Sequence, residues 1–270
     1  LDGVLHNACN IVFPCYGFMN NDKLVGQWNE CSYKGSTPEF NLFNEGLASV
    51  PIRDVGDENK YGVINRLGKF EIKPKRYYYI GQFCHGLATF SANGQYYGGI
   101  DTAGKVILKP MFLSVGTKQN GHLVPVLDKR YKWGLWDLYT DDYWCYGYDE
   151  IKDFVDGFVA VKHNDKWGYC KFGRLWIDYI YDTAENFSEG LALVSKNGKY
   201  GFINKDGDII IPLQYEKAFS FSEGLAWVKR PKENGEFINT NNEFQFSCSY
   251  DARYNEEIKF HKGYAIMTNE

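Results

Sequence analysis

Residues 187–212 read FSEGLALVSKNGKYGFINKDGDIIIP. Three short apolar segments in this stretch are separated by Asn197-Gly198 and Asp206-Gly207. Both dipeptides are typical of two-residue hairpin turns, because their residues tolerate the positive φ that these turns need. Pro212 cannot donate a hydrogen bond to a neighbouring strand, so we expect the third segment to end there. The stretch therefore predicts a β-meander with strands at 191–194, 200–204 and 209–211, and with 214–219 as a candidate fourth strand.

Two elements of this stretch recur along the chain. An aromatic residue followed by glycine occurs at Tyr16, Tyr61, Tyr97, Trp133, Trp167 and Tyr200, with a degenerate copy at Asn234-Gly235. A Gly-Leu-Ala-type element occurs at Gly46, Gly86, Gly121, Gly157, Gly190, Gly224 and Gly263. The sequence therefore predicts an all-β protein of seven tandem units of about 33–45 residues, in a single domain over residues 1–270. The aromatic residues of the first element should lie in the core.

The order of these elements at the two ends suggests how the units are arranged. The first aromatic-Gly strand lies at 16–20 and the last Gly-Leu-Ala-type strand at 263–267, and within one unit these two strands form a hairpin. Pairing them would complete a seventh unit and leave no exposed sheet edge. We therefore expect a seven-bladed β-propeller closed by its terminal strands. The alternative is an open β-solenoid, because most of the units are shorter than the roughly 40–45 residues of a familiar blade.

Two copies of the aromatic-Gly element read Lys-Trp-Gly, at residues 132–134 and 166–168. In this the chain resembles the WG (or KWG) repeat family, over roughly residues 15–267. Tyrosine replaces tryptophan at four of the aromatic positions, and the seventh copy keeps only the glycine. The resemblance implies a β-rich repeat domain, found mostly in bacteria. It implies no catalytic residue.

Composition narrows the class of partner and the compartment. The net charge is -4 and the pI is ≈ 5.8, whereas a nucleic-acid surface normally carries a basic face. No segment approaches the roughly 18 consecutive apolar residues of a membrane helix. We therefore expect neither nucleic acid nor membrane as a partner. Seven cysteines without CxxC spacing are typical of thiols in a reducing compartment, which favours the cytoplasm over export.

Candidate catalytic and metal-binding residues are few. The short motifs of phosphate, zinc, acyl-transfer and dinucleotide sites do not occur in the sequence. Residues 204–208 have the oxygen spacing of a calcium loop but lack its glycine and glutamate. Acidic residues precede four repeat glycines, at Glu45, Asp156, Glu189 and Glu223. A recurring position is typical of turn residues that bind backbone N–H groups, and we expect a protein that is not an enzyme and has no cofactor or metal.

The aromatic residues that do not follow the repeat are the best candidates for a binding site. Aromatics make up 17% of the chain, which is more than the repeat positions need. Tyr78, Tyr143, Trp144 and Trp176 lie off the period, and tyrosine and tryptophan dominate interface hot spots and sugar platforms. We expect these four to bind a protein partner, with a lectin-like sugar-binding module as the alternative. The competing interpretation is that they only pack between units.

Overall fold

The computed structural model describes residues 5–7, 16–20, 23–28, 43–52, 60–74, 77–117, 121–231, 234–247 and 260–265. Within these ranges the chain forms strands, turns and irregular segments without any helix, which confirms the all-β class. The chain divides into two compact units, Leu1–Tyr143 and Trp144–Glu270. The expectation of a single domain stays a prediction.

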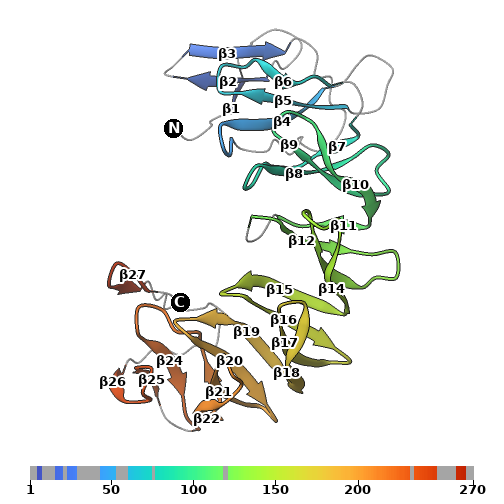
Figure 1. Cartoon of the computed structure of the whole chain (residues 1–270). Coiled ribbons are helices and arrows are strands. Elements are labelled where there is room, and N and C mark those ends of the chain that lie inside the picture. The colour runs from blue at the N-terminus through green and yellow to red at the C-terminus, as the bar shows by residue number, and fades with distance from the viewer. Residues whose placement is uncertain are drawn as a thin grey trace. The chain divides into compact units, whose positions relative to one another are not determined.

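The described strands lie in eight small sheets that follow one another along the chain (Figure 1). The first sheet holds β1 (Leu5–Asn7), β2 (Tyr16–Asn20) and β3 (Lys23–Trp28), and the second holds β4 (Leu47–Ile52), β5 (Lys60–Asn65) and β6 (Phe70–Ile72). The third holds β7 (Tyr79–Ile80), β8 (Leu87–Ser91), β9 (Tyr97–Asp101) and β10 (Val106–Phe112). The fourth holds β11 (Ser114–Val115), β12 (Leu123–Leu127), β13 (Trp133–Asp137) and β14 (Asp142–Tyr148).

The remaining sheets continue the same pattern. The fifth holds β15 (Glu150–Val155), β16 (Phe158–His163), β17 (Lys166–Lys171) and β18 (Arg174–Tyr181). The sixth holds β19 (Thr183–Ser188), β20 (Leu191–Lys196), β21 (Lys199–Asn204) and β22 (Ile209–Tyr215). The seventh holds β23 (Lys217–Ala218), β24 (Ala226–Lys229), β25 (Gly235–Ile238) and β26 (Phe244–Ser247), and the eighth is the hairpin of β27 (Phe260–His261) and β28 (Tyr264–Ala265).

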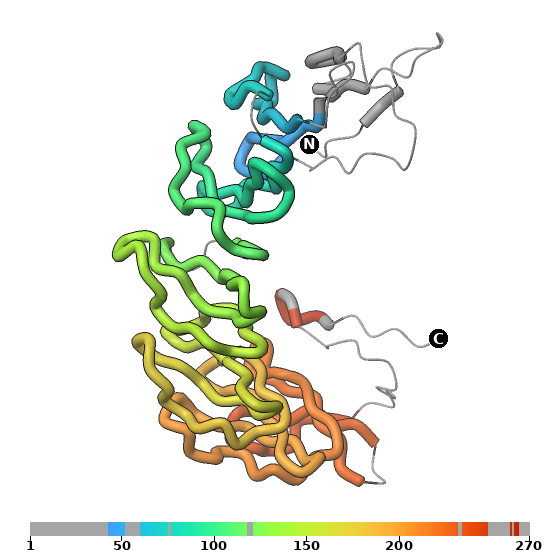
Figure 2. The backbone as a smooth tube through the Cα atoms, turned by 90° about the vertical axis from the view of Figure 1, so that its right-hand side faces the viewer, coloured from blue at the N-terminus to red at the C-terminus, as the bar shows by residue number. Residues whose placement is uncertain are grey.

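Strands of each four-stranded sheet pair in chain order, and we term them the first, second, third and outer strands. The second strand follows the glycine of the Gly-Leu-Ala-type element, as Leu191 follows Gly190. The third strand carries the aromatic-Gly pair, as β21 carries Tyr200. Figure 2 follows this meander from green to orange along the chain. Both predicted elements thus mark the same two strands in successive sheets.

Two expectations for the end of the meander were wrong. Pro212 does not end the third predicted segment, because β22 continues through it to Tyr215. Tyr200 pairs with Tyr215 and Phe202 with Ile211, so the proline lies in a bulge of an edge strand, where its missing N–H does no harm. The expected strand 214–219 is divided between two sheets: residues 214–215 end β22, and β23 begins the next sheet.

The expected pairing of the terminal strands is also wrong. A strand has two edges, and both edges of β2 are occupied: Phe18 pairs with Leu5 of β1 on one side and with Val25 of β3 on the other. The segment β1, which sequence analysis did not predict, takes the place expected for residues 263–267. In the described part of that segment, Tyr264 pairs instead with His261. Residues 266 and 267 lie outside the described residues.

The glycine of the aromatic-Gly pair is required by a close approach of two backbones. The bulge of β22 brings its main chain over Gly201, where a Cβ atom would lie 2.6 Å from the carbonyl oxygen of Ile211. The same contact would be 2.4 Å at Gly168, from Ile177, and 2.3 Å at Gly98, from Leu108. Real Cβ atoms do not come so near to a backbone oxygen, so only glycine fits these three positions.

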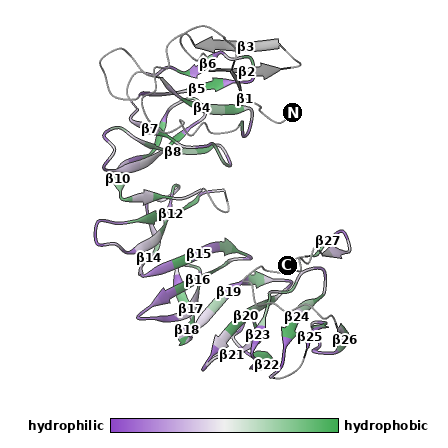
Figure 3. Ribbon diagram, turned by 180° about the vertical axis from the view of Figure 1, so that it is seen from behind, coloured by the Kyte–Doolittle hydropathy of each residue, from purple (hydrophilic) through white to green (hydrophobic). Residues whose placement is uncertain are grey.

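Apolar side chains of the second and third strands fill the space between successive sheets. Figure 3 shows hydrophobic colouring on inner strands such as β8 and β24. Phe187 of β19 lies 4.9 Å from the ring of Phe158 and 5.0 Å from that of Tyr169, both in the preceding sheet. Buried aromatic pairs of this kind contribute about 1 kcal/mol each beyond the area that they bury.

A carboxylate from one sheet binds the turn that precedes the second strand of the next sheet. Glu223 accepts hydrogen bonds from the backbone N–H groups of Lys262 and Gly263, both at 2.7 Å. Glu189 accepts one from Gly224 at 2.9 Å. These glutamates themselves have positive φ, 53° at Glu189, because they occupy the first central position of a tight turn. We term this contact the turn latch.

The turn latch recurs at the start of the chain and is supported by a second hydrogen bond. Glu45 accepts from the N–H groups of His85 at 2.6 Å and Gly86 at 2.9 Å. The preceding residue, Asn44, donates its side-chain amide to the carbonyl of Phe83 at 2.8 Å. Ser188 and Ser222 occupy the position of Asn44 in later units and donate to the carbonyls of Phe221 and Phe260. The expectation that the recurring acidic residues bind backbone N–H groups is therefore confirmed for Glu45, Glu189 and Glu223.

The fourth acidic residue, Asp156, makes a different contact. Its carboxylate accepts a hydrogen bond from Lys205 Nζ at 3.1 Å. Aspartate is one methylene shorter than glutamate, which accounts for its failure to reach the following turn. Asp156 has the same backbone conformation as Glu189, with φ of 52°, and so provides a matched comparison.

Replacing Glu189 with alanine should lower the free energy of unfolding by about 1–2 kcal/mol, because it removes a charge-assisted hydrogen bond between two sheets. Asp156→Ala makes the same change at the same φ and removes only an exposed ion pair, so it should cost less than about 0.5 kcal/mol. Urea unfolding of both variants measures the difference. Equal losses would show that the turn latch does not stabilise the protein.

Candidate interaction surface

The outer strands form the open edges of the sheets. In the described part of the chain, β22 has one neighbour, β21, and β26 has one neighbour, β25. An edge strand presents backbone N–H and C=O groups that can pair with another chain, and proteins usually protect such edges with charged residues. Neither β22 (IIIPLQY) nor β26 (FQFS) contains a charged residue. Pro212 protects β22 in part, whereas β26 has no such protection.

Large apolar side chains are exposed along the outer strands of the unit Trp144–Glu270. The exposed fraction is 49% for Trp176, 54% for Ile209 and 60% for Phe244. Together the exposed set is Tyr146, Leu175, Trp176, Ile180, Ile209, Ile210, Phe244 and Phe246. We term these eight residues the outer-strand surface. Large apolar side chains that recur on exposed outer strands are candidates for a site of interaction.

Neighbouring outer strands are linked through the turns between them. Trp176 Nε1 of β18 donates a hydrogen bond to the carbonyl of Lys205 at 3.0 Å, in the turn that leads to β22. The Tyr215 hydroxyl of β22 donates to Asn242 Oδ1 at 2.7 Å, in the turn that leads to β26. Lys171 Nζ also lies 4.4 Å from the centre of the Trp176 ring. The Trp176 ring is thus held in place while half of it remains in solvent.

The other three aromatic residues predicted for binding are differently placed. Tyr78 is exposed, and its ring lies against the hairpin of β8 and β9, where a Cβ on Gly94 would come within 2.8 Å of it. Tyr143 is half-buried, 4.9 Å from the ring of Trp136, and burial raises the pKa of its hydroxyl. Trp144 is half-buried against Phe154, at 5.6 Å. A role in binding stays a prediction for all four residues.

The aromatic residues of the repeat pack inward to different degrees. Trp167 is 7% exposed and belongs to a core cluster. Tyr61, Tyr97 and Tyr200 are half-buried and pack against such clusters, and Trp133 is also half-buried. The side chain of Tyr16 lies outside the described residues.

Sequence reasoning missed the apolar residues of β22 and β26. It predicted a strand at residues 209–211 without saying which of its side chains are exposed, and in the structure Ile211 is buried while Ile209 and Ile210 are exposed. The sequence did contain a signal for these exposed residues, because a strand that ends a meander carries no charged residue. Such a strand has only one neighbour, so its exposed face needs polar residues unless something covers it.

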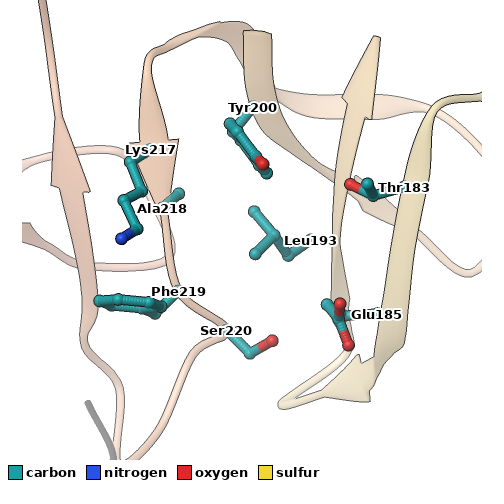
Figure 4. A pocket seen from close by; sticks show the side chains of 8 residues that line it. All are labelled: Thr183, Glu185, Leu193, Tyr200, Lys217, Ala218, Phe219 and Ser220. Carbon is teal, nitrogen blue, oxygen red and sulfur yellow. The ribbon is translucent and has the colours of Figure 1, made fainter. Parts of the chain in front are cut away.

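A polar groove lies between β19 and the segment 217–222 of the next sheet. It consists of two adjoining pockets of about 280 Å³ each that share Glu185 and Ser220. Figure 4 shows the first pocket, with Thr183 and Glu185 on one side and Lys217, Phe219 and Ser220 on the other. The second pocket is lined by Glu185, Asn186, Phe187, Ser188, Ser220, Phe221 and Ser222. We term the two pockets the β19–β23 groove.

Other candidate sites are accounted for within the described residues. Asn204 Oδ1 accepts hydrogen bonds from the N–H groups of Asp206 and Asp208, at 3.0 and 2.9 Å, so the calcium-like spacing belongs to a hairpin turn. In the described ranges no three His, Cys, Asp or Glu side chains gather as a metal site. The same ranges contain no helix that is long and apolar enough to cross a membrane. Cys84, Cys145 and Cys170 are not joined in disulfides.

Comparison with known families identifies the repeat. Residues 61–96, 147–167, 171–200 and 200–230 match the model of the WG containing repeat. The repeats are WG repeats. The matches include the aromatic residues of three aromatic-Gly pairs, Tyr61 of β5, Trp167 of β17 and Tyr200 of β21. A matched repeat such as 200–230 therefore begins at the aromatic-Gly pair of one sheet and runs through its outer strand to the second strand of the next sheet, and its tryptophan or tyrosine is the residue that precedes the close backbone approach. No curated protein sequence is significantly similar to this chain.

Several solved structures are similar to this WG-repeat chain at low identity. The computationally designed Ika8 protein is 12% identical over 96% of this chain and 89% of its own, with a TM-score of 0.44. BamB from Moraxella catarrhalis is 10% identical over 86% and 79%, with a TM-score of 0.42. Hsv2 from Kluyveromyces lactis is 13% identical over 61% and 62%, with a TM-score of 0.37. These scores are too low to specify how the repeats are arranged.

Alanine substitutions should separate the repeat aromatics from the outer-strand surface. Trp167→Ala should lower the free energy of unfolding by about 3–5 kcal/mol, because it leaves a cavity in the core. Trp176→Ala should cost about 1 kcal/mol, because half of the ring is already in solvent and one hydrogen bond is lost. Thermal and urea unfolding measure both values. If Trp176→Ala destabilised the protein as much as Trp167→Ala, its ring would be part of the core rather than of a binding surface.

Proposed function

We propose that this WG-repeat chain is a non-catalytic interaction module that binds a protein partner through its outer-strand surface. The observation that carries the proposal is β26, in which all four residues, Phe244 to Ser247, are exposed and none is charged. An extended segment of a partner that pairs with β26 would supply hydrogen bonds to the edge that no described strand occupies, and would cover Phe244 and Phe246. The occupant is therefore an extended protein strand.

Apolar area and electrostatics favour a protein over the other classes of partner. The large exposed apolar side chains of β22 and β26 are aliphatic and aromatic, their exposed polar side chains are uncharged, and the net charge of the chain is -4. A polyanion such as nucleic acid would be repelled by that charge and would find no basic residue on β22 or β26. Turn latches fix the second sheet to the third, the sixth to the seventh and the seventh to the eighth, so the meanders at these junctions are stable frames for such edges.

The number and arrangement of the repeats form a second part of the proposal. Six aromatic-Gly elements with one degenerate copy, and seven Gly-Leu-Ala-type elements, support seven WG units, and we propose that they are arranged as the blades of a β-propeller. A four-stranded antiparallel meander is the unit from which propeller blades are built. Closure by the terminal strands is not part of this proposal, because β2 already has two partners.

Substitutions on β26 test the proposed binding surface. A double variant, Phe244→Ser with Phe246→Ser, should lower the melting temperature by only about 2–4 °C, because Phe244 is 60% exposed and Phe246, which stacks on Phe237 at 4.7 Å, is 44% exposed. It should weaken capture of a native-lysate partner by about tenfold or more, since exposed aromatics that become buried in a complex are typical hot spots. Affinity capture followed by quantitative mass spectrometry gives the ratio of partner bound by the variant to partner bound by the parent.

Leu67→Ser is the matched control. Leu67 is also a large exposed apolar residue, 73% exposed, but it lies in the turn between β5 and β6 rather than on an outer strand. It should leave capture unchanged. A partner captured equally well by parent, control and double variant would contradict the proposal, and so would a partner lost only with Leu67→Ser.

A further inference from the structure

Two positive charges lie opposite each other in the hairpin of β17 and β18. These strands are neighbours (Figure 1), and Lys171 pairs with Arg174 at the turn that joins them. Directly opposed side chains lie on the same face of an antiparallel pair, and like charges in this position destabilise it. Among the described residues neither Lys171 nor Arg174 forms an ion pair. The free protein therefore contains a repulsion that a bound anion would relieve.

A second pair of opposed cations, in the hairpin of β20 and β21, has a carboxylate beside it. Lys196 pairs with Lys199 at this turn. The carboxylate of Asp182 accepts a hydrogen bond from the N–H of Asn197, between the two lysines, at 2.6 Å. Within the described ranges no carboxylate binds the turn of residues 172–173 in this way. The negative charge that accompanies one pair of cations is thus missing from the other.

Aromatic rings surround the ammonium group of Lys171. Its Nζ lies 4.4 Å from the centre of the Trp176 ring, 4.8 Å from that of Phe158 and 5.3 Å from that of Phe172. Cation–π contacts of this kind hold the ammonium group in place but leave its charge unneutralised. Trp176 is 49% exposed and Phe172 is 74% exposed. Two large exposed rings therefore lie beside two unpaired cations.

Phe172 has a backbone conformation that is unusual for its residue type. Its φ is 48°, and that of Gly173 is 72°. Two-residue turns with positive φ favour asparagine or aspartate before the glycine, as at Asn197-Gly198, whereas a bulky residue is strained there. Packing does not account for the choice, because the Phe172 side chain is mostly in solvent. Backbone strain that packing does not explain is concentrated at functional sites.

We propose that Lys171, Phe172, Arg174 and Trp176, which we term the β17–β18 tip, bind an acidic segment of a protein partner in which a carboxylate adjoins an apolar side chain. The inference rests on the proposed function, because Trp176 belongs to the outer-strand surface, and it names the chemistry of the partner there. The guanidinium of Arg174 can bind a carboxylate through two parallel hydrogen bonds, and Lys171 adds a second positive charge. The adjoining apolar side chain covers Trp176 and Phe172.

The other charges near the β17–β18 tip favour a short acidic segment. Lys205, whose carbonyl binds Trp176, already pairs with Asp156 at 3.1 Å. Asp178, the other charged residue of β18, lies four residues from Arg174, about 13 Å along an extended strand. A nucleic acid carries one phosphate per nucleotide and needs a longer series of cations, which β18 does not provide beyond Arg174.

Peptide binding to the full chain, measured by isothermal titration calorimetry, tests the β17–β18 tip. The probe is a hexapeptide of alternating glutamate and phenylalanine, blocked at both ends. In three comparison peptides glutamine or lysine replaces the glutamate, or serine replaces the phenylalanine, and oligothymidine serves as the polyanion. The probe should bind about tenfold or more tightly than each comparison ligand, because only the probe supplies both the charge and the apolar side chain. Its affinity should fall at high salt, which screens exposed charges.

Substitutions of Arg174 separate binding from stability. Arg174→Gln should weaken binding of the probe by about tenfold, and the matched control Lys199→Gln, at the other pair of opposed cations, should leave it unchanged. Arg174→Glu should also abolish binding of the probe. It should raise the melting temperature by about 1–3 °C, because it turns a repulsive cross-strand pair into an attractive one. A residue with a purely structural role would not combine a gain in stability with a loss of binding.

This proposal and the proposed function can fail separately. The Phe244→Ser, Phe246→Ser variant should bind the probe like the parent, because β26 is not part of the β17–β18 tip. Loss of partner capture by that variant without any binding of the probe would overturn this inference alone. Equal binding of probe and comparison peptides, tighter binding of oligothymidine, full binding by Arg174→Gln, or a lower melting temperature of Arg174→Glu would also overturn it.

Discussion

The close approach between the third and outer strands is the constraint on which each repeat depends. At Gly201 the main chain of β22 passes so near that a Cβ atom would lie 2.6 Å from a carbonyl oxygen. Glycine is therefore fixed at this position, and the aromatic residue before it is directed to the space between sheets. The bulge that creates the approach also lets β22 accommodate Pro212 and reach the edge of its sheet. The glycine of the repeat motif is thus required by one backbone contact.

A second kind of bulge lies in the first strand of a sheet, and its side chains make one junction between sheets differ from the next. Lys152 and Glu185 occupy bulges in successive sheets and form an ion pair. In the next sheet Phe219 takes this position and lines the β19–β23 groove. The same backbone frame therefore yields a closed junction or a pocket, depending on which side chains the bulge presents.

Local signals in the sequence predicted the strands and turns but not which strand edges and side chains are exposed. Asn197-Gly198 and Asp206-Gly207 each mark a real hairpin, because positive φ is a local requirement of the turn. Two expectations failed because they depended on contacts that local signals do not specify. β1 occupies the edge of β2 that was expected to pair with the last strand, and a bulge lets β22 continue past Pro212. Trp176 could be placed on the surface from its departure from the period. Ile209 and Phe244 could not, because burial depends on neighbours distant in the chain.

The carboxylate of the turn latch accepts hydrogen bonds from backbone N–H groups of the turn that it binds. Glu45, Glu189 and Glu223 therefore engage, through backbone N–H groups, turns whose first residues differ in chemistry: His85, Glu223 and Lys262. A DNA segment encoding one repeat can be duplicated behind any repeat that carries the glutamate, and the new copy is held at once without a compensating substitution. Such arrays are free to lengthen by duplication while the sequence of each copy diverges.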